Sequence, residues 1–234
     1  MTSTTSSGAR SPSQEIIDQI CTRVENIERD APLKIGIDGV DGAGKTTFAT
    51  ALANALKFSG HDVARSSTDN FHRPKHERYR LGSDSPAGFY NDSFDYDQIQ
   101  KYVLNPLSNS GTRRCRFSAY DHSTDSELLT PEVTVSENSI LVFDGIFLMR
   151  PELRNYWDLS IFLRVSFEEN LARTIRRDFE NNRMETTTIE EFTARHESRY
   201  VGGQRMYLDE VKPESRVDIV IDNENPESPF IVSI

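Results

Sequence analysis

Residues 33–55 read LKIGIDGVDGAGKTTFATALANA, and this stretch determines how the rest of the chain can fold. Apolar residues alternate with Lys34 and Gly36 at its start, which is typical of a β-strand. Glycines then interrupt the chain, and the periodic, alanine-rich segment 47–56 indicates a helix. The stretch therefore predicts a strand, a tight loop and a helix, in that order.

The loop at 39–46 fits the pattern G-x-x-x-x-G-K-[ST] at every fixed position. Glycines let the backbone curl so that its N–H groups point at phosphate oxygens, and the following helix adds its positive N-terminal end. Lys45 would reach the β- and γ-phosphates, and the Thr46 hydroxyl would bind Mg²⁺. A glycine-rich turn without a ligand is the alternative, but the strand before it and the helix after it favour a nucleotide site. The residues expected to contact the nucleotide are Gly39, Asp41, Gly42, Ala43, Gly44, Lys45, Thr46 and Thr47.

The composition of the 234-residue chain limits the classes of function. A formal net charge of −10 argues against a surface that coats a nucleic acid polymer. Cys21 and Cys115 form no C-x-x-C pair, so neither a disulfide framework nor a zinc site is indicated. The N-terminus lacks the apolar core of a signal peptide, and no apolar run is long enough to span a bilayer. We therefore expect a cytoplasmic protein with no membrane partner.

The N-terminal residues differ in composition from the rest of the chain. Residues 1–13 are almost entirely Ser, Thr and other small residues, and we expect them to form a flexible tail. Apolar residues then recur at helical spacing from Ile16 to Ile27, which predicts an amphipathic helix over about 14–30. The chain length suits one large α/β domain, which we place at 14–234, with two small domains as the weaker alternative.

A short predicted strand at 63–67 is followed by the sequence Thr68-Asp69-Asn70-Phe71-His72-Arg73. In an open α/β sheet, ligands bind at the carboxyl ends of the strands, so Asp69 should face the nucleotide. Asp69 is therefore a candidate general base, although an Asp in this place could also cap the next turn. The segment 75–95 shows no periodicity and predicts a long loop that forms part of an acceptor-substrate pocket.

The middle of the chain predicts a helix at 94–107 and short strands at 113–120 and 132–135. His122 follows the first of these strands. It could bind a substrate or make a hydrogen bond within its loop, and the sequence favours neither interpretation over the other.

The run SILVFDGIFLM at 139–149 predicts a central parallel strand that is buried on both faces. Asp144 lies toward its carboxyl end, where a P-loop enzyme keeps an acidic residue near Mg²⁺. An Asp in the turn before Gly145 is the weaker alternative. Further strands are expected at 159–165 and at 216–222.

A predicted helix at 167–179 carries several arginines in an otherwise acidic chain. P-loop kinases need arginines that close over the transferred phosphoryl group, so we interpret this segment as a lid at about 173–190. A solvated helix face is the alternative. A further helical segment is expected at 189–207, with a break at Gly202-Gly203.

Taken in order, these parts resemble the uridine kinase branch of the P-loop kinases, a group similar to phosphoribulokinase and bacterial pantothenate kinase. The resemblance covers about 33–223. Besides the P-loop, it is carried by 68–73, which is similar to the family's Asp-x-Phe-Tyr-Arg, and by the segments Tyr120-Asp121, 143–146 and 170–178.

The resemblance implies an α/β, P-loop NTPase-type fold with a mostly parallel sheet, helices on both faces and an arginine-bearing lid. It implies transfer of the γ-phosphoryl group from ATP, bound with Mg²⁺, to a hydroxyl of a small molecule. The leading acceptor is the 5′-hydroxyl of a nucleoside such as uridine or cytidine. Asp69 would take the proton from that hydroxyl, while Asp144 would lie near the metal. Arg173 and Arg177 would be the catalytic arginines of the lid. The residues implied to bind the acceptor are His72, Arg73, Asp92, Tyr120 and His122.

The chain departs from the family pattern around the expected acceptor site. His72 stands where the family has a tyrosine, and 88–93 replaces the family's stretch around a ribose-binding Asp. Tyr120-Asp121 is not followed by the family's histidine and arginine. Another small alcohol, such as a pantothenate-like compound or a sugar phosphate, therefore stays open, as does an ATP-binding regulatory protein without catalysis. A homo-oligomer is also compatible with the resemblance.

Overall fold

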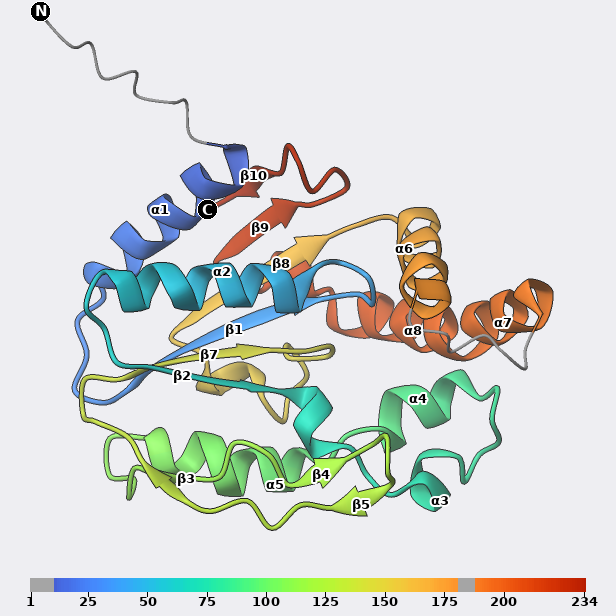
Figure 1. The fold of residues 1–234 in the computed structure, drawn as a ribbon, viewed down its shortest axis with the longest axis horizontal. Helices are drawn as coiled ribbons and strands as arrows, with labels where there is room; N and C mark the ends of the chain where they lie inside the picture. The colour runs from blue at the N-terminus through green and yellow to red at the C-terminus, as the bar shows by residue number, and fades with distance from the viewer. Residues whose placement is uncertain (1–10, 181–187) are drawn as a thin grey trace, which may run out of the picture.

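A six-stranded sheet forms the centre of the protein, whose computed structural model describes residues 11–180 and 188–234 (Figure 1). The strands run in the order β10-β9-β8-β1-β7-β2. All neighbouring pairs are parallel except β10 and β9, which confirms the expected α/β fold with a mostly parallel sheet. The strands are β1 (Leu33–Gly39), β2 (Val63–Ser67), β7 (Ile140–Asp144), β8 (Leu159–Arg164), β9 (Ile219–Asp222) and β10 (Phe230–Ser233).

Helices cover both faces of this sheet (Figure 1). Helices α1 and α2 pack on one face, whereas α4, α5 and α8 contribute to the core on the other face. Two π-helical segments, Gln100–Leu104 and His196–Val201, continue α5 and α7. The helices are α1 (Pro12–Glu25), α2 (Lys45–Phe58), α3 (Lys75–Arg78), α4 (Pro86–Asp92), α5 (Tyr96–Ile99), α6 (Phe167–Glu180), α7 (Ile189–Arg195) and α8 (Gly202–Val211).

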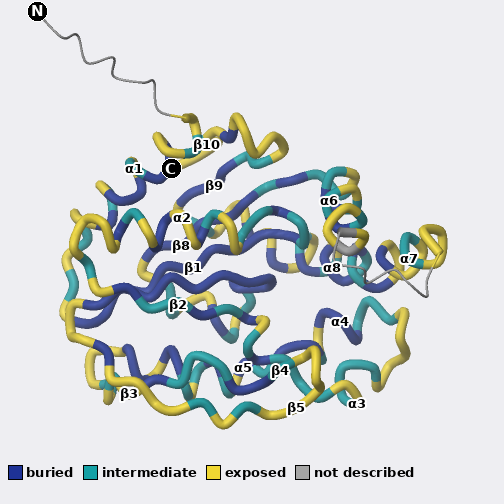
Figure 2. The backbone as a smooth tube through the Cα atoms, viewed as in Figure 1, coloured by how far each residue is buried: buried dark blue, intermediate teal, exposed yellow. Residues whose placement is uncertain are grey.

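The central strands are buried on both sides, as the dark blue strands of Figure 2 show. In β7, Ile140 and Val142 pack toward α1 and α2, while Leu141 and Phe143 join the opposite core. Successive side chains of a strand point to opposite faces, so a strand buried on both faces must be apolar at every position. This explains why the sequence here shows a continuous apolar run.

The N-terminal helix α1 begins at Pro12 and ends at Glu25, so the predicted tail is wrong at residues 11–13, and the predicted helix is too long at its C-terminal end. Ser11 caps it by accepting a hydrogen bond of 3.3 Å from the Gln14 N–H, and Pro12 occupies the first turn. Residues 1–10 of the predicted tail and 181–187 of the predicted lid lie outside the described residues. No helix in the two described ranges is both long enough and apolar enough to cross a membrane.

The prediction of one long loop at 75–95 is wrong, because α3 and α4 form within it. Ser85 caps α4 by accepting a hydrogen bond of 3.0 Å from the Gly88 N–H, and Pro86 starts the helix. Both helices are too short to give a clear helical periodicity, which is why the sequence pattern did not reveal them.

The predicted strand at 113–120 is also wrong in its extent. Only β3 (Arg114–Cys115) and β4 (Tyr120–Asp121) form there, and they pair with β6 (Val133–Thr134) and β5 (Ser126–Glu127) in separate two-stranded ribbons. The apolar run 139–149 likewise does not stay a strand, since β7 ends at Asp144. Phe147, which is fully buried, has a φ of 68°, a left-handed conformation that does not occur within a β-strand.

The predicted break at Gly202-Gly203 does not occur, because α7, the π-helical segment and α8 follow one another without interruption. A Cβ atom on Gly203 would lie 2.8 Å from Phe89 and 2.9 Å from the Pro86 carbonyl oxygen. These glycines therefore permit close packing against α4. The structure also contains β10, an edge strand that the polar C-terminal sequence did not predict.

Candidate active site

The carboxyl ends of three neighbouring strands bring the predicted catalytic residues together. In the sheet register, Asp144 at the end of β7 pairs with Ile37 of β1 on one side and Ser67 of β2 on the other. The P-loop follows β1 and Asp69 follows β2, so both lie beside Asp144. This is the edge at which open α/β sheets bind their ligands.

The P-loop backbone is shaped for an anion. Gly42 and Gly44 have φ values of 65° and 85°, a left-handed conformation that favours glycine. A Cβ atom on Gly42 would also lie only 3.0 Å from the Asn170 carbonyl oxygen. Helix α2 starts after Gly44 without a side-chain cap, so its first N–H groups have no partner within the helix. These groups are available to phosphate oxygens.

Side chains from the surrounding elements fix the carbonyl groups of the loop. Each of four successive carbonyl oxygens accepts a hydrogen bond, which directs the carbonyls toward the protein and leaves the opposite side of the loop for the ligand. The donors are Lys45 to Val40 at 2.7 Å, Asn170 to Asp41, Arg173 to Gly42 at 3.1 Å, and Asn223 to Ala43 at 2.8 Å.

Helices α6 and α8 hold the Asp41 peptide through a buried polar network that the sequence did not predict. The Asp41 N–H donates to Gln204 at 2.8 Å, and Asn170 binds the Asp41 carbonyl. The Asn170 side-chain oxygen in turn accepts a hydrogen bond of 2.7 Å from His196 Nε2. Asn170 and Gln204 are fully buried. Because single polar residues on helices carry no motif, only the fold reveals their role.

A cavity of about 410 Å³ lies in front of the loop. It is lined by P-loop residues together with side chains from the ends of β2 and β7 and from α6. Among the predicted site residues it contains Asp41, Gly42, Gly44, Lys45, Thr46, Thr47, Asp69, Asp144, Arg173 and Arg177.

Both oxygens of the Asp144 carboxylate have protein partners. Thr46 donates its hydroxyl to one oxygen at 2.7 Å, and Arg65 of β2 donates to the other at 2.7 Å. Asp144 is buried, so the charge of Arg65 compensates its own. The sequence did not identify Arg65 as a site residue. A basic residue within a short strand of an α/β sheet could have indicated a buried ion pair.

The residues here fit Mg²⁺ bound together with nucleotide phosphates. No group of three or more His, Cys, Asp or Glu side chains within 11–180 and 188–234 could hold a metal ion by itself. Mg²⁺ commonly takes only one or two protein ligands and completes its shell with phosphate oxygens and water. The Thr46 hydroxyl next to the Asp144 carboxylate provides oxygen donors of this kind beside the P-loop.

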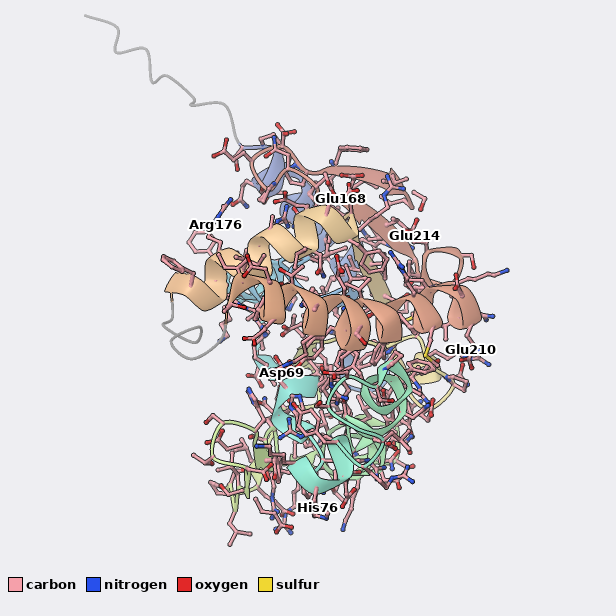
Figure 3. All side chains as sticks on the ribbon, turned by 90° about the vertical axis from the view of Figure 1, so that its right-hand side faces the viewer. Asp69, His76, Glu168, Arg176, Glu210 and Glu214 are labelled. Carbon is pink, nitrogen blue, oxygen red and sulfur yellow. The ribbon has the colours of Figure 1, made fainter. Side chains whose placement is uncertain are left out.

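Asp69 is the second residue of the short 3₁₀ turn Thr68–Phe71, which Ser67 caps by accepting a hydrogen bond of 3.2 Å from the Asp69 N–H. Figure 3 shows Asp69 between the layer of α8 and the layer of α3, which carries His76. Its carboxylate reaches the solvent of the cavity, yet the surrounding protein removes much of its hydration. This desolvation raises the pKa of Asp69 above its ordinary value, while nearby Lys45 partly opposes the shift.

A second cavity, of about 760 Å³, adjoins the first. The two share Asp41, Asp69, Ile146 and Arg177, so Asp69 faces both. His72 and His122 line the second cavity with their ring centroids 4.9 Å apart.

His72 is held in one orientation at the start of this second cavity. Burial lowers its pKa to about 4, so the ring is neutral near pH 7. Its Nδ1–H therefore donates to the Asp69 carbonyl oxygen at 3.0 Å. The ring also lies against Phe94, with centroids 4.8 Å apart. These contacts place a flat, neutral surface next to Asp69.

Three of the predicted acceptor residues lie outside both cavities. Arg73 binds the Phe94 carbonyl and Glu77, and Asp92 accepts hydrogen bonds from Arg80 at 3.2 Å. Tyr120 donates its hydroxyl at 2.7 Å to Asp125, a residue that does line the second cavity.

The arginines of α6 divide according to their contacts. Arg173 donates to the carbonyls of Gly42, Asn223 and Glu224 and to the Glu169 carboxylate, so it joins the P-loop to the end of the sheet. Arg177 lines both cavities, while Arg176 lies on the exposed side of α6, away from Asp69 (Figure 3).

Comparison with known proteins places this architecture among small-molecule kinases. Residues 34–214 match the sequence model of the Phosphoribulokinase / Uridine kinase family. The uridine kinase of Ligilactobacillus salivarius is 24% identical over 193 residues, which cover 78% of this chain and 85% of that protein.

Solved structures share the fold at low sequence identity. A possible uridine kinase from Bacillus stearothermophilus superposes with a TM-score of 0.69 at 22% identity, covering 88% of this chain and 97% of the other. D-glycerate 3-kinase from Cryptococcus neoformans superposes with a TM-score of 0.61 at 13% identity, covering 96% and 99%. Likeness at this level establishes the fold and leaves the acceptor open.

Proposed function

Because this chain belongs to the Phosphoribulokinase / Uridine kinase family, we propose that it transfers the γ-phosphoryl group of ATP to a hydroxyl of a small molecule. The observation that carries this proposal is the position of Asp69, which faces both the P-loop cavity and the adjoining cavity. A protein that only binds ATP has no need of a second cavity joined to the first at a carboxylate.

The reaction follows from the way the two cavities join. The P-loop holds the phosphates of ATP, and the second cavity holds the acceptor with its hydroxyl near Asp69. The hydroxyl oxygen attacks the γ-phosphorus in line with the leaving oxygen, so one P–O bond forms as the bond to ADP breaks. Asp69 accepts the hydroxyl proton, and the phosphorylated acceptor and ADP are the products.

Cationic side chains stabilise the charge that spreads over the transferred group. Lys45 starts the helix behind the phosphates, and Arg177 lies at the junction of the two cavities. Arg173 acts as a positioning residue, because its guanidinium is bound to carbonyl groups of the P-loop and of the sheet end. Mg²⁺, when bound through Thr46 beside Asp144, would neutralise part of the phosphate charge.

Two acceptor classes are compatible with this site. A nucleoside is the acceptor implied by the names of the uridine kinases that resemble this chain. The charged lining of the second cavity favours a different small alcohol.

The proposed transfer is tested by measuring ADP release from MgATP in the presence of uridine, cytidine, other ribosides, pantothenate and simple sugar phosphates. We expect one class of acceptor to raise ADP release well above the rate without acceptor. The Lys45→Ala variant should lose this stimulation, because it lacks the cation beside the phosphates. ATP binding without stimulation by any acceptor would support a regulatory ATP-binding protein instead.

A further inference from the structure

The part of the second cavity that lies beyond its junction with the P-loop is strongly basic. The chain as a whole has a formal net charge of −10, so this concentration of positive charge needs a cause. Past the shared residues, the cavity lining contains four cationic side chains and one carboxylate: Lys75, Arg78, Arg195, Arg199 and Asp125.

Arg199 is the most deeply buried of these cations, with 2% of its surface exposed. Its terminal nitrogens donate to backbone carbonyls, at 2.9 Å to Arg78 and at 3.2 Å to Ser85. Its Nε has no hydrogen-bond partner, and no carboxylate in the described part of the chain pairs with it. The ring of Tyr79 lies 4.4 Å from the guanidinium. Carbonyls and a ring face do not neutralise a buried charge, so the guanidinium of Arg199 is suited to an anionic partner.

Arg78 has only a shared counter-charge. It donates to Asp125 at 3.1 Å, but the same carboxylate oxygen also accepts from the Tyr120 hydroxyl and from the Lys75 backbone N–H. The Nε of Arg78 is buried and has no partner. The side-chain nitrogen of Lys75, which lines the cavity, makes no ion pair or hydrogen bond with any residue in 11–180 or 188–234.

We propose that the acceptor is an alcohol that carries an anionic group, bound by Lys75, Arg78 and Arg199 while its hydroxyl faces Asp69. This inference rests on the proposed kinase activity and names its substrate class. A guanidinium presents parallel N–H groups that match the oxygens of a phosphate or a carboxylate. A phosphate monoester and a carboxylate share this chemistry, and matched pairs of acceptors distinguish them.

A neutral nucleoside fits this end of the cavity less well. A neutral nucleoside would displace water from Arg78 and Arg199 without supplying a counter-charge. A site rejects a ligand that leaves its buried polar groups unpaired. If Arg199 served only to fasten the segment 78–85 to the helix, its loss would affect stability but would not discriminate between charged and neutral acceptors.

The test uses matched acceptors that differ in their anionic group: ribose and ribose 5-phosphate for the phosphate, and glycerol and D-glycerate for the carboxylate, with uridine and cytidine as neutral nucleosides. ADP release is measured for the wild type and for Lys75→Gln. The Lys75 side chain is exposed and has no partner among the described residues, so the variant should fold. Lys57→Gln is the matched control, since Lys57 is exposed at the end of α2, outside both cavities.

We expect kcat/KM for at least one charged acceptor to be at least tenfold higher than for its neutral counterpart. The pair with the larger difference identifies the anionic group that the site binds, a phosphate or a carboxylate. Lys75→Gln should lower kcat/KM for that acceptor about tenfold through KM, while Lys57→Gln should leave it unchanged. Turnover of a neutral nucleoside at least as efficient as that of every charged acceptor would overturn the anion site and leave the kinase proposal intact.

A binding measurement separates failure of the anion site from failure of the kinase proposal. Inorganic phosphate and acetate are titrated calorimetrically into protein saturated with MgADP. We expect saturable binding of one of these anions, weakened several-fold by Lys75→Gln but not by Lys57→Gln. If an anion binds in this way but no acceptor is phosphorylated, the proposed kinase function is contradicted while the proposed anion site is supported. Absence of binding, or binding equal in all three proteins, would overturn the anion site.

Discussion

Arg65 of β2 and Asp144 of β7 form an ion pair across the parallel sheet, with the guanidinium 2.7 Å from the carboxylate. The second carboxylate oxygen accepts the Thr46 hydroxyl. With its proton directed at Asp144, the Thr46 oxygen keeps its lone pairs for the phosphate side of the site. Asp144 therefore orients Thr46, and Arg65 keeps the charge of Asp144 compensated.

The ion pair predicts a loss of stability in Arg65→Met. The variant leaves the Asp144 carboxylate, which is 2% exposed, without its counter-charge. We expect the free energy of unfolding to fall by about 2–3 kcal/mol, less than the roughly 3–5 kcal/mol of a wholly buried pair because Arg65 is partly exposed. Urea denaturation measures this change. The double variant Arg65→Met/Asp144→Asn should recover part of the loss, and purely additive effects would contradict a direct interaction.

The buried network around Asp41 predicts that α6 controls the P-loop. Asn170→Ala removes the donor to the Asp41 carbonyl and the acceptor for His196. We expect ATP to bind about tenfold more weakly, corresponding to about 1.4 kcal/mol, because the loop loses one of its fixed carbonyls. Isothermal titration calorimetry measures the dissociation constant. Asn54→Ala, at an exposed position of α2, is the control and should bind ATP like the wild type. Equal affinities in all three proteins would refute a role for Asn170 in shaping the loop.

A second buried contact beneath the P-loop predicts an effect on stability. The Tyr207 hydroxyl donates to Asp38, which is fully buried, and accepts from the Met149 N–H at 3.1 Å. Tyr207→Phe leaves both groups short of a partner, so we expect a loss of about 2–3 kcal/mol of unfolding free energy. The Tyr102 hydroxyl makes no hydrogen bond with any residue in the described part of the chain, so Tyr102→Phe should change stability little. A Tyr207→Phe protein as stable as the wild type would show that this hydrogen bond contributes nothing.

The histidine next to Asp69 predicts a pH dependence of stability. Burial lowers the pKa of His72 from 6.5 to about 4, so protonation favours the unfolded chain. Its stabilising effect is present above pH 6.5 and is lost as the pH falls from about 6.5 to about 4. His72→Gln does not titrate, and its unfolding free energy should decline less steeply over this interval. Denaturant titrations at several pH values test this, and parallel curves for the two proteins would contradict it.

The sequence predicted the sheet and the P-loop well because both depend on local pattern. The motif at 39–46 fixes the loop, and continuous apolar runs specify strands buried on both faces, as in β7 and β8. Asp69 and Asp144 were placed correctly beside the P-loop because parallel strands bring their carboxyl ends to one edge.

The rest of the site depends on contacts between residues far apart in the chain. Arg199 meets Arg78, and Gln204 meets Asp41, only after α8 has packed beside the sheet. Asp38 was overlooked because a carboxylate in an apolar strand gives no sign of its partner, Tyr207, which lies 169 residues away. The acceptor end of the cavity could not be predicted, since short helices such as α3 and α4 lack a clear periodicity.

The most direct test of the account is transfer of the labelled γ-phosphoryl group from ATP to the acceptor in a single turnover, compared between the wild type and Asp69→Asn. The substitution keeps the size of the side chain and removes the base. We expect transfer to slow by at least about 10²-fold, while the dissociation constant for ATP stays within about twofold of the wild-type value. Wild-type transfer by Asp69→Asn would contradict the assignment of Asp69 as the catalytic base. Label found only in inorganic phosphate would contradict transfer to an alcohol altogether.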